Sequence, residues 1–100
     1  MVLAIDIGNT NIVIGCFEGE KVLFVERVST NQRATDLEYA SIIRMALHIH
    51  SVESSALEGA IISSVVPTLT SVIKRAISKE ILTKRGLISI FDYYQKVAHI

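Results

Sequence analysis

The apolar and polar positions of residues 1–29 predict three short strands joined by tight turns. Residues 2–7 form a nearly continuous apolar run, which is typical of a strand buried on both faces. The turn formers Gly8, Asn9, Thr10 and Asn11 interrupt this run, and a second β-rich run over residues 12–17 follows at once. A short hairpin turn at residues 18–20 leads into an alternating third run over residues 21–29. Together these runs predict an antiparallel three-strand meander.

A polar connection over residues 29–33 precedes a helical pattern. Thr35 followed three residues later by Glu38 is a capping-box signature, so we expect a helix to begin there. The apolar side chains of this segment recur at helical spacing and occupy a wide stripe, which predicts a largely buried helix. They are Leu37, Ala40, Ile42, Ile43, Met45, Ala46, Leu47 and Ile49.

The remaining pattern predicts one more strand and a second helix. Residues 60–62 form an apolar run ending at residues 63–66, and Pro67 suits the first turn of a helix, where its missing N–H does no harm. Residues 86–91 predict a further strand, and residues 92–100 receive no assignment. The apolar face of the second helix comprises Leu69, Val72, Ile73, Ala76 and Ile77, and its solvent face is expected to carry Lys74, Arg75, Lys79 and Glu80. The order β-β-β-α-β-α predicts an α/β domain with a mixed sheet and packed helices.

Composition narrows the class of protein. The chain has 100 residues, enough for one domain, and half of them are hydrophobic. Ten basic and ten acidic side chains balance, so no electrostatic footprint points to nucleic acid or to an anionic membrane. No apolar stretch approaches the roughly 20 residues that span a bilayer, and Asp6 comes too early for a signal peptide. Cys16 is the only cysteine, which favours a buried thiol and a reducing cytoplasm. We expect a cytoplasmic protein without a nucleic-acid or membrane partner.

The segment from Asp6 to Asn11 carries the clearest chemistry. We expect Gly8 to turn the chain with positive φ and to let a ligand approach the backbone closely. Consecutive amides in such a turn can hold an anion, and Thr10 and Asn11 add side-chain donors. A carboxylate beside phosphate needs a divalent cation, so Asp6 is interpreted as a magnesium partner, directly or through water. The P-loop pattern does not occur in the sequence, and the dinucleotide fingerprint needs three glycines opening a helix, whereas this loop has one and opens a strand.

Weaker candidates have a structural reading at least as good as the functional one. Ser63 and Ser64 either end a strand and cap the following helix or belong to an active site, and the sequence leaves both readings open. His48 and His50 lie two residues apart and diverge on a helix, so they are interpreted as surface histidines. Tyr93 and Tyr94 lack a local sequence that supports a substrate contact. The basic side chains are interpreted as a solvated helix face, and they are Lys74, Arg75, Lys79, Lys84 and Arg85.

Three strings then resemble one family. The string Asp-Ile-Gly-Asn-Thr-Asn from Asp6 resembles the first phosphate loop of the actin, Hsp70 and sugar-kinase superfamily. Its extension to Gly15 resembles type III pantothenate kinases in particular, as do the strings over residues 62–67 and 35–39. The resemblance implies an actin-like, ribonuclease H-like ATPase lobe. It also implies ATP binding by Asp6, Ile7, Gly8, Asn9, Thr10, Asn11, Ile12 and Val13, with the metal at Asp6.

The same resemblance implies an activity and its cofactors. Family members phosphorylate pantothenate to 4'-phosphopantothenate with ATP, the first step of coenzyme A biosynthesis. They work as homodimers and need Mg2+ and a monovalent cation, K+ or NH4+. The competing functions are a non-catalytic nucleotide-binding regulator or transcription accessory factor of the same family, and a filament protein of the actin type. The string over residues 62–67 favours the kinase over the filament protein.

The resemblance covers roughly residues 1–80. The family's Gly-x-Asp-Arg motif, whose aspartate is the general base, does not occur, and the surroundings of Asp92 do not match it. The second phosphate loop and the adenosine-binding segment are also absent from the sequence. We therefore expect an amino-terminal lobe at residues 1–80, a divergent tail at residues 81–100 and no carboxy-terminal lobe. One interpretation of the tail is that its sequence is not homologous to the family. Such a fragment, with no catalytic residue, is expected to be inactive.

Overall fold

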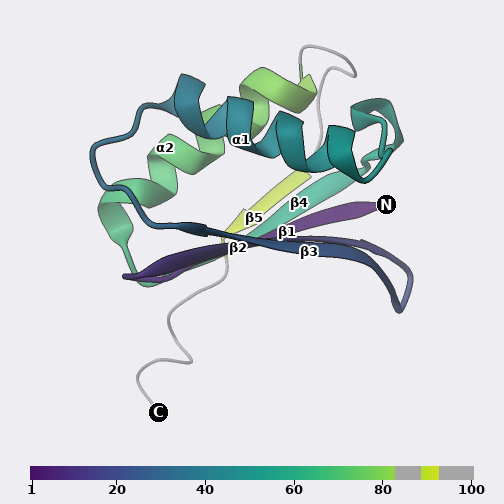
Figure 1. The fold of residues 1–100 in the computed structure, drawn as a ribbon, viewed down its shortest axis with the longest axis horizontal. Coiled ribbons are helices and arrows are strands. Elements are labelled where there is room, and N and C mark those ends of the chain that lie inside the picture. The colour runs from purple at the N-terminus through teal and green to yellow at the C-terminus, as the bar shows by residue number, and fades with distance from the viewer. Residues whose placement is uncertain (83–88, 93–100) are drawn as a thin grey trace.

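The computed structural model of the chain describes residues 1–82 and 89–92. A five-stranded sheet lies beneath two helices, and both helices cover the same face of the sheet (Figure 1). Among the described residues, no helix is long and apolar enough to cross a membrane. The elements in chain order are β1 (Val2–Ile7), β2 (Asn11–Glu18), β3 (Lys21–Ser29), α1 (Asp36–Ile49), the 3-10 helix η1 (Ser54–Ala56), β4 (Gly59–Ser64), α2 (Pro67–Ile77), the π-helix η2 (Ser78–Leu82) and β5 (Ser89–Asp92).

The sheet order β3-β2-β1-β4-β5 joins the meander to two parallel strands. Strand β2 pairs antiparallel with β1 and β3, and β4 pairs parallel with β1 and β5. The register places Asn11 opposite Ser29 and Asp6 opposite Ser63. The predicted meander is confirmed, and its β2–β3 turn contains Gly19 at φ 63°, a conformation that favours glycine. Loop 8–10 lies at the other end of β2 from this turn.

Helix α1 begins where the capping box predicted. The Thr35 backbone N–H donates to Glu38 Oε1 at 2.8 Å, and the Glu38 N–H donates to Thr35 Oγ1 at 3.2 Å. These bonds satisfy two amides that a helix start leaves without intrahelical partners. The backbone and hydroxyl hydrogen bonds from Thr35 lower the pKa of the Glu38 carboxyl.

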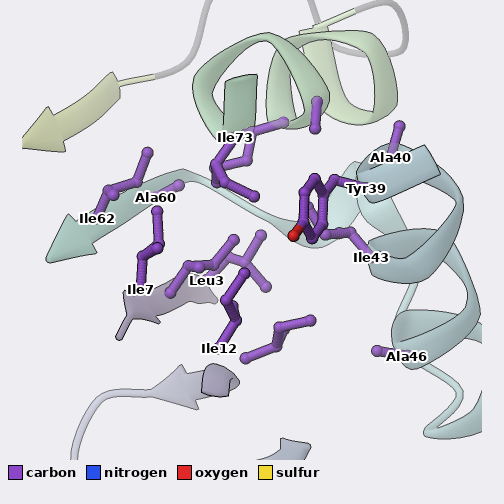
Figure 2. Close-up of a cluster of buried hydrophobic side chains, with 14 of the residues drawn as sticks. Leu3, Ile7, Ile12, Tyr39, Ala40, Ile43, Ala46, Ala60, Ile62 and Ile73 are labelled. Carbon is purple, nitrogen blue, oxygen red and sulfur yellow. The ribbon is translucent and has the colours of Figure 1, made fainter. Parts of the chain in front are cut away.

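The core lies between the helices and the sheet (Figure 2). Strands β1 and β2 alternate, so every second side chain faces the helices. Strand β1 was expected to be buried on both faces, and this is wrong for the described residues. Val2 and Ala4 are only half-buried and Asp6 is exposed, because both described helices pack on the opposite face. The most completely buried side chains of the core are Leu3, Ile5, Ile7, Ile12, Ile43, Leu57, Ile62, Leu69, Ile73 and Ile77.

Helix α1 is less buried than its sequence predicts. Leu37 is 65% exposed, and Met45 and Ile49 are each 60% exposed. The side chains that bury against the sheet and α2 form a narrower stripe, namely Tyr39, Ala40, Ile43, Ala46 and Leu47. A surface helix contacts its neighbours along one stripe, so the apolar residues outside this stripe remain in solvent.

The expected solvent face of α2 is wrong at Glu80, which is 4% exposed and lies 2.9 Å from Arg44 Nε. The α-helix ends at Ile77 and η2 continues as a π-helix. Glu80 follows buried Ala76 by four residues and buried Ile77 by three, so helical spacing places it on the buried stripe of α2 in spite of its charge. The fifth strand, predicted at 86–91, is present as β5, while residues 86–88 lie outside the described residues. Lys84, Arg85, Tyr93 and Tyr94 also lie outside them.

Candidate phosphate-binding site

The turn between β1 and β2 is closed by one backbone bond. The Gly8 N–H donates to the Asn11 carbonyl at 2.9 Å. The expected positive φ at Gly8 is wrong, because the described glycine with positive φ is Gly19. The structure favours glycine here for a steric reason instead, since a Cβ built at Gly8 would make a tight contact of 3.0 Å with the Asn11 carbonyl oxygen. The second expectation for Gly8, close approach of a ligand to the backbone, stays a prediction.

Two further bonds hold this turn from the end of β3. Thr30 Oγ1 donates to the Gly8 carbonyl at 2.7 Å, and the Thr30 N–H donates to the Thr10 carbonyl at 2.8 Å. Sequence reasoning treated Thr30 as part of a polar connection and missed this contact. The predicted meander contains the signal for this contact. Because Asn11 pairs with Ser29, the residue after Ser29, which is Thr30, lies beside the turn between β1 and β2.

The turn offers hydrogen-bond donors to solvent. Asn9, Thr10 and Asn11 are exposed. Within the part of the chain that the structure describes, the amides of Asn9 and Thr10 make no backbone hydrogen bond, and the side chains of these three residues have no hydrogen-bond partner. Free amides on one exposed turn suit an anion.

Asp6 lies beside this turn on the open face of the sheet. Strand alternation points the Asp6 side chain away from the helices, and the residue that pairs with Asp6 on the neighbouring strand β4 is Ser63. A shallow hollow of about 230 Å³ is lined by both, together with Ala4, Val13 and Ile61. Among the described residues the Asp6 carboxylate takes part in no hydrogen bond or ion pair. It is therefore an accessible anion with no partner in residues 1–82 and 89–92.

The apolar residues of the expected ATP site divide between the two faces of the sheet. Ile7 and Ile12 are 0% and 1% exposed and belong to the core. Any contact that these two make with a ligand must therefore involve their backbone. Val13 is half-buried and pairs with Asp6 in the β1–β2 register, so it faces the open side.

The structure separates the roles of the two serines. Ser64 is buried, and its Oγ donates to the Val66 carbonyl at 3.1 Å and accepts from the Val66 N–H at 3.0 Å. This hydroxyl therefore holds the turn that leads into α2. The Val65 N–H donates to the Ile7 carbonyl at 3.0 Å, which ties the same turn to the end of β1. Ser63 is the serine that lies beside Asp6.

The donor set fits a magnesium ion that arrives with phosphate. No group of three or more His, Cys, Asp or Glu side chains among the described residues can hold a metal ion. Magnesium usually takes one or two carboxylates, keeps several waters and completes its shell with substrate phosphates. Asp6 supplies one accessible carboxylate of that kind, so the residues fit Mg2+ bound to a nucleotide and do not form an all-protein cage.

The other candidate side chains serve the fold. Cys16 is fully buried, and burial raises the pKa of its thiol, which makes it a poor nucleophile. His50 Nε2 lies 2.6 Å from Glu26 Oε2, and its ring stacks on Phe24 with centroids 4.4 Å apart. His48 and His50 are both on the surface, as expected.

Comparison with known proteins identifies the family of the chain. The family profile described as type III pantothenate kinase matches residues 2–90. A type III pantothenate kinase of Moorella thermoacetica is 41% identical over 81 residues, which are 81% of this chain and 32% of that protein. A second, of Finegoldia magna, is 46% identical over 79 residues, which are 79% of this chain and 30% of that protein. The chain thus spans about a third of the length of these curated relatives.

Solved structures share the fold at low identity. The ROK hexokinase of Thermus thermophilus superposes with a TM-score of 0.60 at 19% identity, covering 93% of this chain and 34% of the hexokinase. Thermus thermophilus RuvC gives a TM-score of 0.55 at 17% identity, covering 93% of this chain and 63% of RuvC. These likenesses confirm the expected actin-like, ribonuclease H-like lobe. Since the family profile covers most of its length, the chain belongs to the type III pantothenate kinase family.

Proposed function

We propose that the protein containing this chain transfers the γ-phosphoryl group of ATP to pantothenate, giving 4'-phosphopantothenate, and that this lobe binds the ATP phosphates. The observation that carries the proposal is the accessible, unpartnered Asp6 carboxylate beside a turn whose Asn9 and Thr10 amides are free among the described residues. The kinase names of the relatives support the substrate assignment.

Each group of the turn has a distinct task in this proposal. The amides of Asn9 and Thr10 donate to phosphate oxygens, and the side chains of Thr10 and Asn11 add donors at the rim. Asp6 holds Mg2+ directly or through water, and the bound ion offsets negative charge that develops on the phosphates. Phosphoryl transfer depends mainly on such positioning and charge stabilisation, so a precisely held turn is a direct contribution to rate.

The remaining parts of the proposed enzyme lie outside this chain. Its sequence contains no Gly-x-Asp-Arg motif, so we assign the base that accepts the pantothenate hydroxyl proton to the rest of the protein. The adenosine site and the second phosphate loop belong there as well. The working enzyme is proposed to be a cytoplasmic homodimer that requires K+ or NH4+, as the family resemblance implies.

The test is the Asp6→Asn variant of the full-length protein, assayed for ATP- and pantothenate-dependent turnover across a magnesium titration. We expect kcat to fall roughly 100-fold, the size seen when one electrostatic contact to the transition state is removed. Because Asp6 is exposed, the free energy of unfolding should change by no more than about 0.5 kcal/mol.

The matched control is Glu20→Gln, the same carboxylate-to-amide change in the hairpin turn at the opposite end of β2. It should leave kcat unchanged. Near-normal turnover of Asp6→Asn at saturating magnesium would remove Asp6 from the metal site.

A further inference from the structure

We infer that Thr30 is a positioning residue for the phosphate-binding turn: it holds the turn on both sides of Asn9 and so orients the Asn9 amide, one of the two that are proposed to receive the phosphate. The inference rests on the proposed function of the turn and adds a residue to it. Thr30 follows the last residue of β3, outside the segment that the family resemblance assigns to ATP.

One residue makes both contacts. Its hydroxyl donates to the Gly8 carbonyl at 2.7 Å and its backbone N–H donates to the Thr10 carbonyl at 2.8 Å. The two acceptors flank Asn9, the central residue of the turn. Both distances are at or below the usual length for their type of bond. Thr30 therefore fixes the turn at two points, one on each side of its tip.

The hydroxyl bond to the Gly8 carbonyl determines which way the free Asn9 amide points. The peptide bonds of the described residues include none in the cis form, and a trans peptide unit directs its N–H opposite to its C=O. Holding the Gly8 carbonyl toward Thr30 therefore directs the Asn9 N–H away from β3 and toward solvent. Without that hold, the peptide between Gly8 and Asn9 is free to rotate and present its carbonyl, which would repel a phosphate.

Thr30 is itself rigidly placed. The next residue, Asn31, bonds through its carbonyl and its N–H to the hydroxyl of Tyr39, with distances of 2.7 and 3.0 Å. Tyr39 is 2% exposed and lies among the core side chains of α1 (Figure 2). A continuous series of contacts thus connects the buried Tyr39 of α1 to Asn31, Thr30 and the turn. An already ordered turn loses little conformational freedom when phosphate binds, which strengthens binding.

The test compares Thr30→Val and Thr30→Ser in the full-length enzyme. Valine has nearly the same shape without the hydroxyl, whereas serine keeps it. We expect Thr30→Val to raise KM for ATP roughly tenfold, the factor that about 1.4 kcal/mol of lost interaction produces. KM for pantothenate should stay unchanged, and Thr30→Ser should restore KM for ATP to within about threefold of the original value. The matched control is Thr70→Val, which removes another hydroxyl-to-carbonyl bond, at 3.5 Å in α2, and should change neither KM.

A second readout needs no catalysis. Hydrogen exchange of the Gly8 amide, which is bonded within the turn, should become at least tenfold faster in nucleotide-free Thr30→Val and stay unchanged in Thr30→Ser. An unchanged KM for ATP in Thr30→Val, or an equal rise of both KM values together with a lower melting temperature, would overturn the inference and leave Thr30 a structural residue. If turnover survives Asp6→Asn while Thr30→Val still speeds exchange at Gly8 and raises KM for ATP, the metal assignment fails and the positioning role stands. Absence of any ATP-dependent turnover in the unsubstituted enzyme would overturn both.

Discussion

Replacing Tyr39 by Phe tests whether helix α1 supports the turn through Asn31. The substitution keeps the buried ring and removes only the hydroxyl, which makes two hydrogen bonds to the backbone of Asn31. Each such bond contributes about 1 kcal/mol net, so we expect a local loss of about 2 kcal/mol. The substitution should cost almost no packing energy, because the buried ring stays in place.

The assay is native-state hydrogen exchange on the full-length protein, because it resolves local opening that a global melt averages out. A loss of about 2 kcal/mol corresponds to roughly 30-fold faster exchange. We expect this acceleration at the amides of Asn31 and Thr30, and a smaller one at the Gly8 amide.

The control is Ile43→Val, one turn further along α1. It removes a buried methylene at a cost of about 1 kcal/mol without touching a hydrogen bond. It should destabilise α1 without accelerating exchange at Thr30. Unchanged exchange at Thr30 in Tyr39→Phe, or the same acceleration in Ile43→Val, would refute the reasoning.

Three further outcomes follow from the described residues and the sequence. The pKa of the Glu38 carboxyl is lowered from its ordinary 4.5, so the stability that the ionised carboxylate contributes is present above that pH and is lost as the pH falls through the lowered pKa. The Glu38→Gln variant should lack this part of the acid dependence, as measured by urea unfolding from pH 6 downward. The buried Cys16 thiol, whose pKa burial raises, should react with a disulfide reagent only upon unfolding, and rapid labelling of the folded protein would contradict its placement. The 100-residue chain by itself should form no 4'-phosphopantothenate with ATP, magnesium and potassium, because half of the proposed site lies elsewhere; product above a no-enzyme control would contradict this.

Local signals predicted most of the fold. The meander followed from apolar runs and turn formers, and the start of α1 followed from Thr35 and Glu38, whose interaction spans three residues. Pro67 likewise begins α2 as expected. These signals depend on neighbours in the sequence, so the sequence contains them in full.

What the sequence did not show depends on the three-dimensional arrangement. Glu80 lies at helical spacing from buried Ala76 and Ile77, but its charge favoured a solvent position, and the Arg44 side chain that pairs with it comes from α1, 36 residues away. Met45 remains exposed because α1 contacts its neighbours along one stripe only. The candidate site was predicted at Asp6 and its turn, but the contact from Thr30 joins residues 22 positions apart and required the pairing of β2 with β3.

A crystal structure of the full-length protein with magnesium and a non-hydrolysable ATP analogue tests the central claim most directly. The account predicts phosphate oxygens about 2.7–3.2 Å from the amide nitrogens of Asn9 and Thr10, which is ordinary hydrogen-bond distance. It also predicts the Asp6 carboxylate on the magnesium ion or on one of its waters, and Thr30 still bonded to the carbonyls of Gly8 and Thr10. A nucleotide whose phosphates lie away from this turn, or a metal without Asp6 in its direct or water-mediated shell, would contradict it.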